Sequence, residues 1–198
     1  MTCRVTISSS RGPVVKARAL LDSGSSASFI SDCLSRSLNL PRDQRSLKIS
    51  GIAGLSHNST HHFFTTFQVG SCNDISGQKL CVSAIIIPTV TCDLPTHPIS
   101  VSPGWSHLSG LPLADPDFGC PGAIDLLLGV DVFSEALLQG RRIGPPGSPV
   151  ALETIFGWVL AGSTQPRPQE HLVVYHSPVM NCYASFGRRR KPLLSLQS

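Results

Sequence analysis

One acidic residue stands where a short apolar run gives way to small residues. Asp22 follows an Ala-Leu-Leu run and precedes Ser23-Gly24 in the stretch ALLDSGSSASFIS. This pattern is typical of a strand that ends in a tight turn. A carboxyl group held at such a turn can donate a proton, or accept one when ionised, in general acid–base catalysis. Because an aspartate before Ser-Gly is more often a simple turn residue, the elements around Asp22 must decide between the two roles.

Histidine and cysteine side chains offer a second kind of chemistry, because both can bind metal ions. Five of them lie within one stretch of the chain: His57, His61, His62, Cys72 and Cys81. Their spacing matches no compact ligand pattern, and adjacent histidines on a strand point to opposite faces. We therefore expect neither a metal site nor another cofactor. A serine hydrolase is not indicated either, because the sequence has no Gly-x-Ser-x-Gly turn.

The residues before Asp22 predict a β-hairpin. Arg4–Ser8 and Val14–Leu21 are alternating or apolar runs separated by turn-forming residues, which places Asp22 at the exit of the second strand. Ser31 is a candidate N-cap for a helix that follows. Apolar residues then recur at helical spacing before a proline: Ile30, Leu34 and Leu38. A short helix is therefore expected soon after the Asp22 turn.

Many short strands and little helix are predicted along the rest of the chain, which indicates a mainly β fold. The further strands are Leu47–Ser50, His62–Val69, Lys79–Ile87, Ile124–Gly129 and Thr154–Ala161. Val130–Leu138 has helical spacing, with Gly140 as the expected stop. Between residues 91 and 122 prolines and glycines recur too often for regular structure. Three apolar residues can anchor that segment on the core: Trp105, Leu108 and Leu111. We find no internal repeat in the sequence.

Length and composition fit one folded domain with a tail. Of the 198 residues, 41% are hydrophobic and 14% are charged, which is enough apolar material for a core. We assign residues 1–163 to the domain and residues 164–198 to a flexible, Pro-containing linker and basic tail. The domain carries eleven basic and eleven acidic residues, so the excess positive charge lies in the tail.

The basic run in the tail is Arg188-Arg189-Arg190-Lys191. Such a run could contact nucleic-acid phosphates, but short basic runs are more often solvated chain ends, and nucleic acid is not the expected partner.

The cysteines and the lack of long apolar runs indicate the compartment. The seven cysteines are odd in number and include no Cys-x-x-Cys pair, so neither a disulfide framework nor a zinc knuckle is indicated. The first residues lack the apolar stretch of a signal peptide, and no run approaches the ~18 apolar residues of a membrane helix. We expect an intracellular, cytoplasmic protein with reduced thiols that does not enter membranes.

Five segments, taken in order, resemble the retroviral-type (retropepsin-like) aspartic proteases. They are ALLDSGSSASFIS, ISGIAG, LPLADPDF, IDLLLGVDVF and TIFGWVLAG, and the likeness spans about residues 3–163. Within that group the chain most resembles the protease of BEL/Pao-type retrotransposon polyproteins. The resemblance implies a closed β-barrel with a flap hairpin and one or two short helices, in which each chain carries half of an active site.

The resemblance also implies an aspartic endopeptidase that needs no cofactor. Such an enzyme uses two carboxylates a few ångströms apart that share one proton, because like charges so close cannot both ionise. One carboxylate activates water and the other protonates the peptide carbonyl oxygen. The chain has a single Asp-Ser/Thr-Gly sequence, so the partner acid must be Asp22 of a second copy in a homodimer. The implied substrate is a Gag-Pol-like polyprotein.

The family resemblance assigns roles to three groups of residues. Asp22 would be the catalytic acid, Ser23 would form a hydrogen bond across the dimer, and Gly24 would permit the tight turn. The flap that closes over substrate would be tipped by Gly51, Ile52, Ala53 and Gly54. The residues expected to support the site are Leu127, Leu128 and Gly129, packed beneath the catalytic loop, and Asp131, as a brace or a simple helix-capping acid.

One departure from the compact viral enzymes is the long segment between the flap and Gly129, which matches the retrotransposon branch. The chain is then either a polyprotein fragment or a stand-alone gene derived from one, and a degenerate copy could keep every motif. A second hypothesis therefore stays open, a catalytically inactive retropepsin-like module for dimerisation or peptide binding. The intact Asp22-Ser23-Gly24 favours the enzyme.

Overall fold

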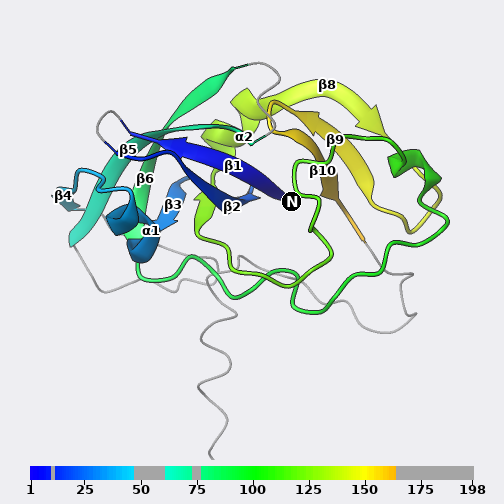
Figure 1. The fold of residues 1–198 in the computed structure, drawn as a ribbon, viewed down its shortest axis with the longest axis horizontal. Coiled ribbons are helices and arrows are strands. Elements are labelled where there is room, and N and C mark those ends of the chain that lie inside the picture. The colour runs from blue at the N-terminus through cyan, green and yellow to red at the C-terminus, as the bar shows by residue number, and fades with distance from the viewer. Residues whose placement is uncertain (10–11, 47–60, 73–76, 164–198) are drawn as a thin grey trace, which may run out of the picture.

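The computed structural model describes residues 1–9, 12–46, 61–72 and 77–163, which form two β-sheets side by side (Figure 1). The larger sheet has seven strands and the smaller has three. Helix in the described residues is limited to two short α-helices and one 3-10 turn. None of these helices is long and apolar enough to cross a membrane. The prediction of a mainly β fold is confirmed.

Six strands of the larger sheet close into a barrel. Their order is β1-β2-β7-β3-β6-β5, and the pairing of β5 with β1 closes the ring. The pairs β2–β7 and β3–β6 are parallel, and the other pairs are antiparallel. The strands are β1 (Thr2–Ser8), β2 (Val15–Leu21), β3 (Ser28–Ser31), β5 (His61–Ser71), β6 (Lys79–Ile87) and β7 (Leu126–Leu128). Outside the ring, β4 (Asp43–Ser46) pairs with the first half of β5.

The barrel contains a repeat of topology that the sequence does not display. A hairpin (β1–β2), a strand (β3) and helix α1 (Asp32–Ser37) make the first half, and β5–β6, β7 and helix α2 (Val130–Ala136) make the second. The two halves correspond in their strand pairing. The second hairpin strand of the first half, β2, lies parallel to β7 of the second half, and the second hairpin strand of the second half, β6, lies parallel to β3 of the first half. Only the first hairpin is followed directly by an acid: Asp22 follows β2, whereas Pro88 follows β6.

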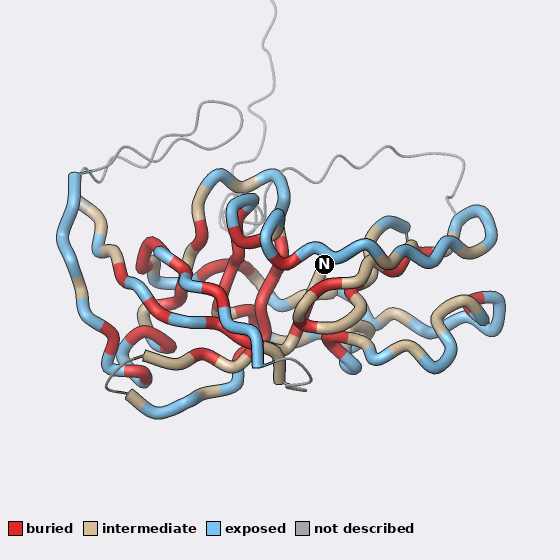
Figure 2. Tube along the Cα trace, turned by 90° about the horizontal axis from the view of Figure 1, so that it is seen from above, coloured by how far each residue is buried: buried red, intermediate tan, exposed pale blue. Residues whose placement is uncertain are grey.

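Alternation of side chains explains why β1 forms the first barrel strand. Cys3, Val5 and Ile7 are all fully buried, while the residues between them are partly exposed. This period of two is the one that places every second side chain of a strand in the core. Figure 2 shows that buried segments run through the middle of the molecule and exposed segments lie at its periphery.

The strand β7 is different, because it is buried on both faces. Leu126 and Leu128 pack in the main core, whereas Leu127 packs in a second cluster with Leu20, Val90 and Ile124. A strand that is covered on both sides has a continuous apolar sequence, and Leu-Leu-Leu is such a sequence. It lies between β2 and β3, the two strands that flank the Asp22 turn.

Helix α1 begins where the sequence predicts. Ser31 is its N-cap, and the Ser31 hydroxyl accepts the Leu34 N–H at 3.2 Å. Asp32 in the first turn forms ion pairs with Arg42 at 2.6 Å and with Arg36 at 2.8 Å. The hydrogen bond from Arg42 is the main reason that the pKa of Asp32 lies below its ordinary value of 3.8.

We expect the ion pairs of Asp32 to stabilise the fold in a pH-dependent way. Because the pKa is lowered by folding, the contribution is complete above the ordinary value of 3.8 and is lost as the pH falls through the lower folded value. Asp32→Asn should modestly lower the unfolding temperature near neutral pH, and this difference should vanish in strong acid. Thermal unfolding of both proteins across that range tests the prediction, and a difference independent of pH would contradict it.

The prediction for the helix after β7 is wrong at its C-terminal end. The helix expected over Val130–Leu138 ends at Ala136, and Leu137–Arg142 forms strand β8, so Gly140 lies in a strand and does not stop the helix. Pairing of Leu137 with Thr154 of the next strand accounts for the early end, because Leu137 takes the extended conformation of a sheet residue.

The single strand predicted over Thr154–Ala161 is also wrong, because this stretch contains a turn. Strand β9 (Val150–Thr154) and strand β10 (Gly157–Ala161) form a hairpin, and β8 completes the second sheet on the other side of β9. Gly157 at the turn has a φ of +113°, a conformation that favours glycine. The strand predicted at Leu47–Ser50 lies outside the described residues.

The segment between β6 and β7 is irregular, as its prolines and glycines predict. Its one helical turn in the structure is the 3-10 turn at Ser106–Leu108. Trp105 is buried, and Leu108 and Leu111 are partly buried, but none of the three belongs to the two clusters of core residues that the structure describes or to the hydrophobic residues packed against them.

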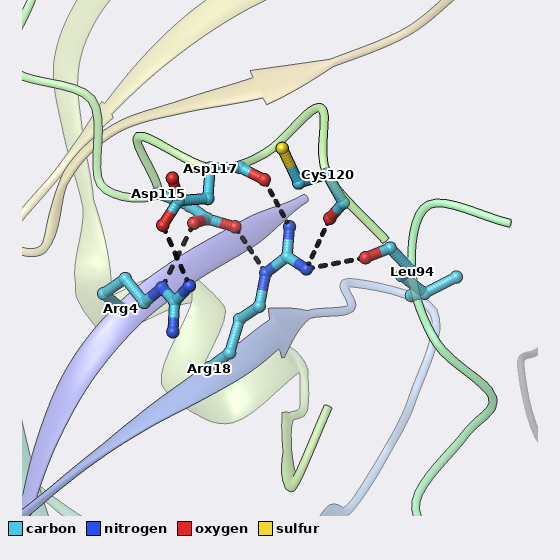
Figure 3. Close-up of polar contacts among 6 residues, drawn as sticks. All are labelled: Arg4, Arg18, Leu94, Asp115, Asp117 and Cys120. Atoms are coloured by element: carbon cyan, nitrogen blue, oxygen red, sulfur yellow. Dashed lines mark hydrogen bonds and ion pairs between the residues drawn. The ribbon is translucent and has the colours of Figure 1, made fainter. Parts of the chain in front are cut away.

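Arg18 on β2 ties this segment to the barrel (Figure 3). Its side chain is only 4% exposed and donates to Asp115 at 2.7 Å. Its remaining hydrogen bonds, at 2.6, 3.0 and 3.1 Å, go to the backbone carbonyls of Leu94, Cys120 and Asp117. Arg4 on the neighbouring strand also donates to Asp115, at 3.3 Å. The sequence does not predict this Arg18 cluster, because Arg18 and Asp115 stand 97 positions apart.

Candidate active site

Asp22 is the first residue after β2, and the neighbouring strand fixes its backbone. Its N–H donates to the Leu128 carbonyl of β7 at 2.9 Å. The carboxylate turns back onto its own loop, where Oδ1 accepts the Gly24 N–H at 2.9 Å and the Asp22 carbonyl accepts the Ser25 N–H at 3.3 Å. Asp22 is partly buried, whereas Ser23 and Gly24 are exposed. The turn therefore presents an oriented carboxylate among exposed residues.

The junction between β7 and α2 holds the far side of this turn. The Gly129 N–H donates to Ser28 Oγ at 3.0 Å, and the Val130 N–H donates to the Ser25 carbonyl at 2.8 Å. A Cβ at Gly129 would lie 2.8 Å from the carbonyl carbon and oxygen of Ala27, so this close approach of two backbones requires glycine. The Asp22 turn is thus bonded to β7 at its start and to the junction at its end.

Gly129→Ala should therefore destabilise the fold and displace the turn. The methyl group cannot fit unless the Ala27 backbone moves, and overpacking of this kind costs about 1–3 kcal/mol. Chemical unfolding measures the loss beside that of Gly104→Ala, whose Cβ would be 3.6 Å from its nearest neighbour, Ser102 Oγ. If the two variants lost the same stability, the close contact at Gly129 would be refuted.

The other predicted residues lie in different surroundings. Leu127 and Leu128 are buried in β7 beneath the turn. Asp131 is exposed in the first turn of α2, where a negative charge is favourable for the helix dipole. The structure thus brings Asp22 together with Leu128 and Gly129, and it places Asp131 on the solvent side of the helix. The predicted flap residues Gly51, Ile52, Ala53 and Gly54 lie outside the described residues.

The start of β1 borders the turn as well. The Leu21 N–H donates to the Met1 carbonyl at 2.8 Å. Burial is the main reason that the pKa of the Met1 α-amino group lies below its ordinary value of 8.0, while Coulombic interactions with Cys3 and Asp22 act in the opposite direction. The Leu21 hydrogen bond thus places Met1 beside the residue that precedes Asp22.

The histidines and cysteines considered for a metal site are spread along two strands and beyond. His62 is on β5, Cys72 follows that strand and Cys81 is exposed on β6, while His57 lies outside the described residues. Within the described part of the chain, no three His, Cys, Asp or Glu side chains are placed to hold a metal ion. The six cysteines there are free thiols.

A pocket of about 460 Å³ lies beside the Arg18 cluster, and its lining includes no residue of the Asp22 turn. The residues that line it are Arg4, Lys16, Ala17, Arg18, Asp117, Cys120, Pro121, Gly122, Ala123 and Asp125.

The basic run at Arg188-Arg189-Arg190-Lys191 is outside the described residues.

Two serines that hold the turn were not predicted from the sequence. Ser25 and Ser28 are two of five serines between residues 23 and 31, and residue type alone does not separate them. One signal was present, because Ser28 stands two positions before Ile30 and so shares the buried face of β3.

Comparisons with known proteins do not extend this picture. No protein-family model matches the chain, and a search of curated proteins finds no match. The interpretation of the site therefore depends on its geometry and on the resemblance carried by its sequence motifs.

Proposed function

We propose that the protein is a homodimeric aspartic endopeptidase with a retropepsin-like fold, in which Asp22 of each subunit supplies one carboxylate of the catalytic pair. The observation that carries the proposal is the Asp22 turn, which is bonded at both ends to β7 and its junction with α2 and leaves the carboxylate partly exposed. General acid–base catalysis needs such a group, held in one geometry and open to substrate.

The need for a second chain follows from the chemistry and from the topology. Peptide hydrolysis by this route uses two carboxylates that share a proton. In the barrel, the position equivalent to Asp22 in the second half is occupied by Pro88, which has no carboxylate. A two-fold axis that passes beside Asp22 would supply the missing acid from an identical subunit.

In this dimer one Asp22 carboxylate is ionised and the other is protonated. The ionised one takes a proton from water as the water oxygen attacks the peptide carbonyl carbon, and the protonated one gives its proton to the carbonyl oxygen. Collapse of the tetrahedral intermediate breaks the C–N bond, with a proton passing to the amine that leaves. The Gly24 N–H on Oδ1 keeps the plane of each carboxylate fixed during these transfers.

The proposed substrate is an extended polypeptide. The sequence resemblance favours a Gag-Pol-like polyprotein of a retrotransposon, cleaved within the cell. The proposal requires no metal ion or organic cofactor, since water and the two carboxylates supply all the reacting groups.

A cleavage assay tests the proposal. We expect the purified protein to cut a mixed peptide library at acidic to neutral pH, with activity that persists after metal chelation and after treatment with serine-directed reagents. Peptide analogues of the tetrahedral intermediate should inhibit it. Loss of activity on chelation would contradict the proposal, and peptide binding without cleavage would support the non-catalytic module instead.

A further inference from the structure

We propose that Ser28 is a positioning residue for Asp22, and that its buried hydroxyl sets the placement of the catalytic turn against the β7–α2 junction. The inference rests on the proposed function, because it assigns the hydroxyl a part in aligning the Asp22 carboxylate. Ser28 itself touches neither substrate nor the reacting atoms in this scheme.

Three hydrogen bonds join the turn and the first residue of β3 to the junction. Two of them connect backbone groups: Asp22 N–H with the Leu128 carbonyl at 2.9 Å, and Val130 N–H with the Ser25 carbonyl at 2.8 Å. The third runs from the Gly129 N–H to Ser28 Oγ at 3.0 Å. The Ser28 bond lies between the other two along the junction, and it alone of the three can be removed by changing a side chain.

Because this hydrogen bond is buried, its removal should have a large effect on the junction. Ser28 is 1% exposed, and the bond to Gly129 is buried. Without the hydroxyl, the Gly129 N–H would have to stay unpaired or move toward another acceptor, and a buried unpaired donor is costly. Movement in the direction of Ala27 is restricted, because the Ala27 carbonyl stands 2.8 Å from the position that a Cβ on Gly129 would take. Relaxation at Gly129 must therefore shift the turn.

A shift of the turn displaces the Asp22 backbone directly. Two-fold symmetry then repeats the same displacement in the partner subunit. Leu128, which accepts the Asp22 N–H, is the residue before Gly129. In a two-fold dimer any displacement of one carboxylate occurs in both subunits, so their separation can change by up to twice that displacement. A misplacement of about 1 Å can reduce the rate of a positioned reaction by about 100-fold.

The experiment compares Ser28→Val with Ser28→Thr, because the two side chains have nearly the same shape and only threonine keeps the hydroxyl. We expect kcat to fall about 10- to 100-fold in the valine variant, with KM and the dimerisation constant little changed, and to recover largely in the threonine variant. Ser28→Ala repeats the loss of the hydroxyl without added bulk, for the case in which valine prevents folding.

Ser35→Ala is the matched control. Ser35 is also fully buried and its hydroxyl also accepts an N–H, from Arg42 at 3.3 Å, but it belongs to α1 and not to the Asp22 turn. We expect a loss of stability in this variant without a fall in the kcat of the folded protein. If both hydroxyl-free Ser28 variants kept the kcat of the threonine variant, the positioning role would be refuted.

A spectroscopic measurement separates this inference from the proposed function. The backbone amide resonances of Asp22 and Gly24 report the turn directly, whether or not the protein cleaves peptides. We expect them to shift in Ser28→Val and to stay close to wild type in Ser28→Thr. Shifted resonances in a protein without protease activity would refute the proposed function only, whereas unshifted resonances would refute the role of Ser28.

Discussion

Asp22→Asn should abolish peptide cleavage and leave the fold intact. The amide cannot hold the shared proton or take a proton from water, and both sites of the pair are lost at once in a homodimer. General acid–base groups contribute about 100- to 10,000-fold each, so residual turnover should fall below detection in an ordinary assay. Folding should not suffer, because an asparagine Oδ1 can still accept the Gly24 N–H that Asp22 accepts at 2.9 Å.

The measurement is the rate of cleavage of a fixed peptide, with circular dichroism and thermal unfolding to confirm the fold. Glu135→Gln is the matched control, because it removes an exposed acid from α2 by the same chemical change. It should keep full activity. Turnover by the Asp22→Asn variant would show that the carboxylate is a turn residue, and the aspartic mechanism would have to be abandoned.

Arg18→Met should cause the largest loss of stability of any single charge removal in the described part of the chain. Asp115 is 1% exposed, and without Arg18 it would keep only the longer contact from Arg4 at 3.3 Å. Removal of one partner from a buried ion pair costs about 3–5 kcal/mol. Three backbone carbonyls that Arg18 now satisfies would also lose a donor. Urea unfolding at neutral pH measures the change.

Two comparisons make the Arg18 prediction specific. Arg45→Met removes an arginine that is 60% exposed and 3.9 Å from Asp43, and it should change stability by less than about 1 kcal/mol. The double variant Arg18→Met with Asp115→Leu should be more stable than Arg18→Met alone, because it no longer buries an unpaired carboxylate. Equal losses of stability for Arg18→Met and Arg45→Met would mean that the Arg18 cluster does not stabilise the segment between β6 and β7.

The parts of the fold that follow a local rule could be predicted from the sequence. The alternating apolar residues of β1 and the N-cap at Ser31 depend on neighbours a few positions away, and both are confirmed. Asp22 was recognisable for the same reason, since the end of a strand and a tight turn are local features. The mainly β fold follows from many such strands, whereas the closed barrel was implied only by the family resemblance.

The parts that were missed depend on partners far along the chain. Leu137 fits a helical pattern, but its pairing with Thr154 draws it into a sheet. Arg18 looks like an exposed strand residue until the segment that contains Asp115 folds over it. Ser28 is one serine among several, and its hydroxyl has a role only through its hydrogen bond with Gly129, which is 101 positions further along the chain. Such contacts have no signature in a single sequence.

The central claim is that each chain holds half of an active site, and subunit mixing tests it most directly. The measurement is cleavage at a fixed concentration of wild-type protein while Asp22→Asn protein is added in excess, with sedimentation to report the dimer. We predict that wild-type activity rises with its own concentration until the dimer is filled, and that added variant suppresses it through heterodimers with one competent carboxylate. A fully active species that sediments as a monomer and ignores the variant would contradict the claim, because Asp22 would then find its partner within its own chain.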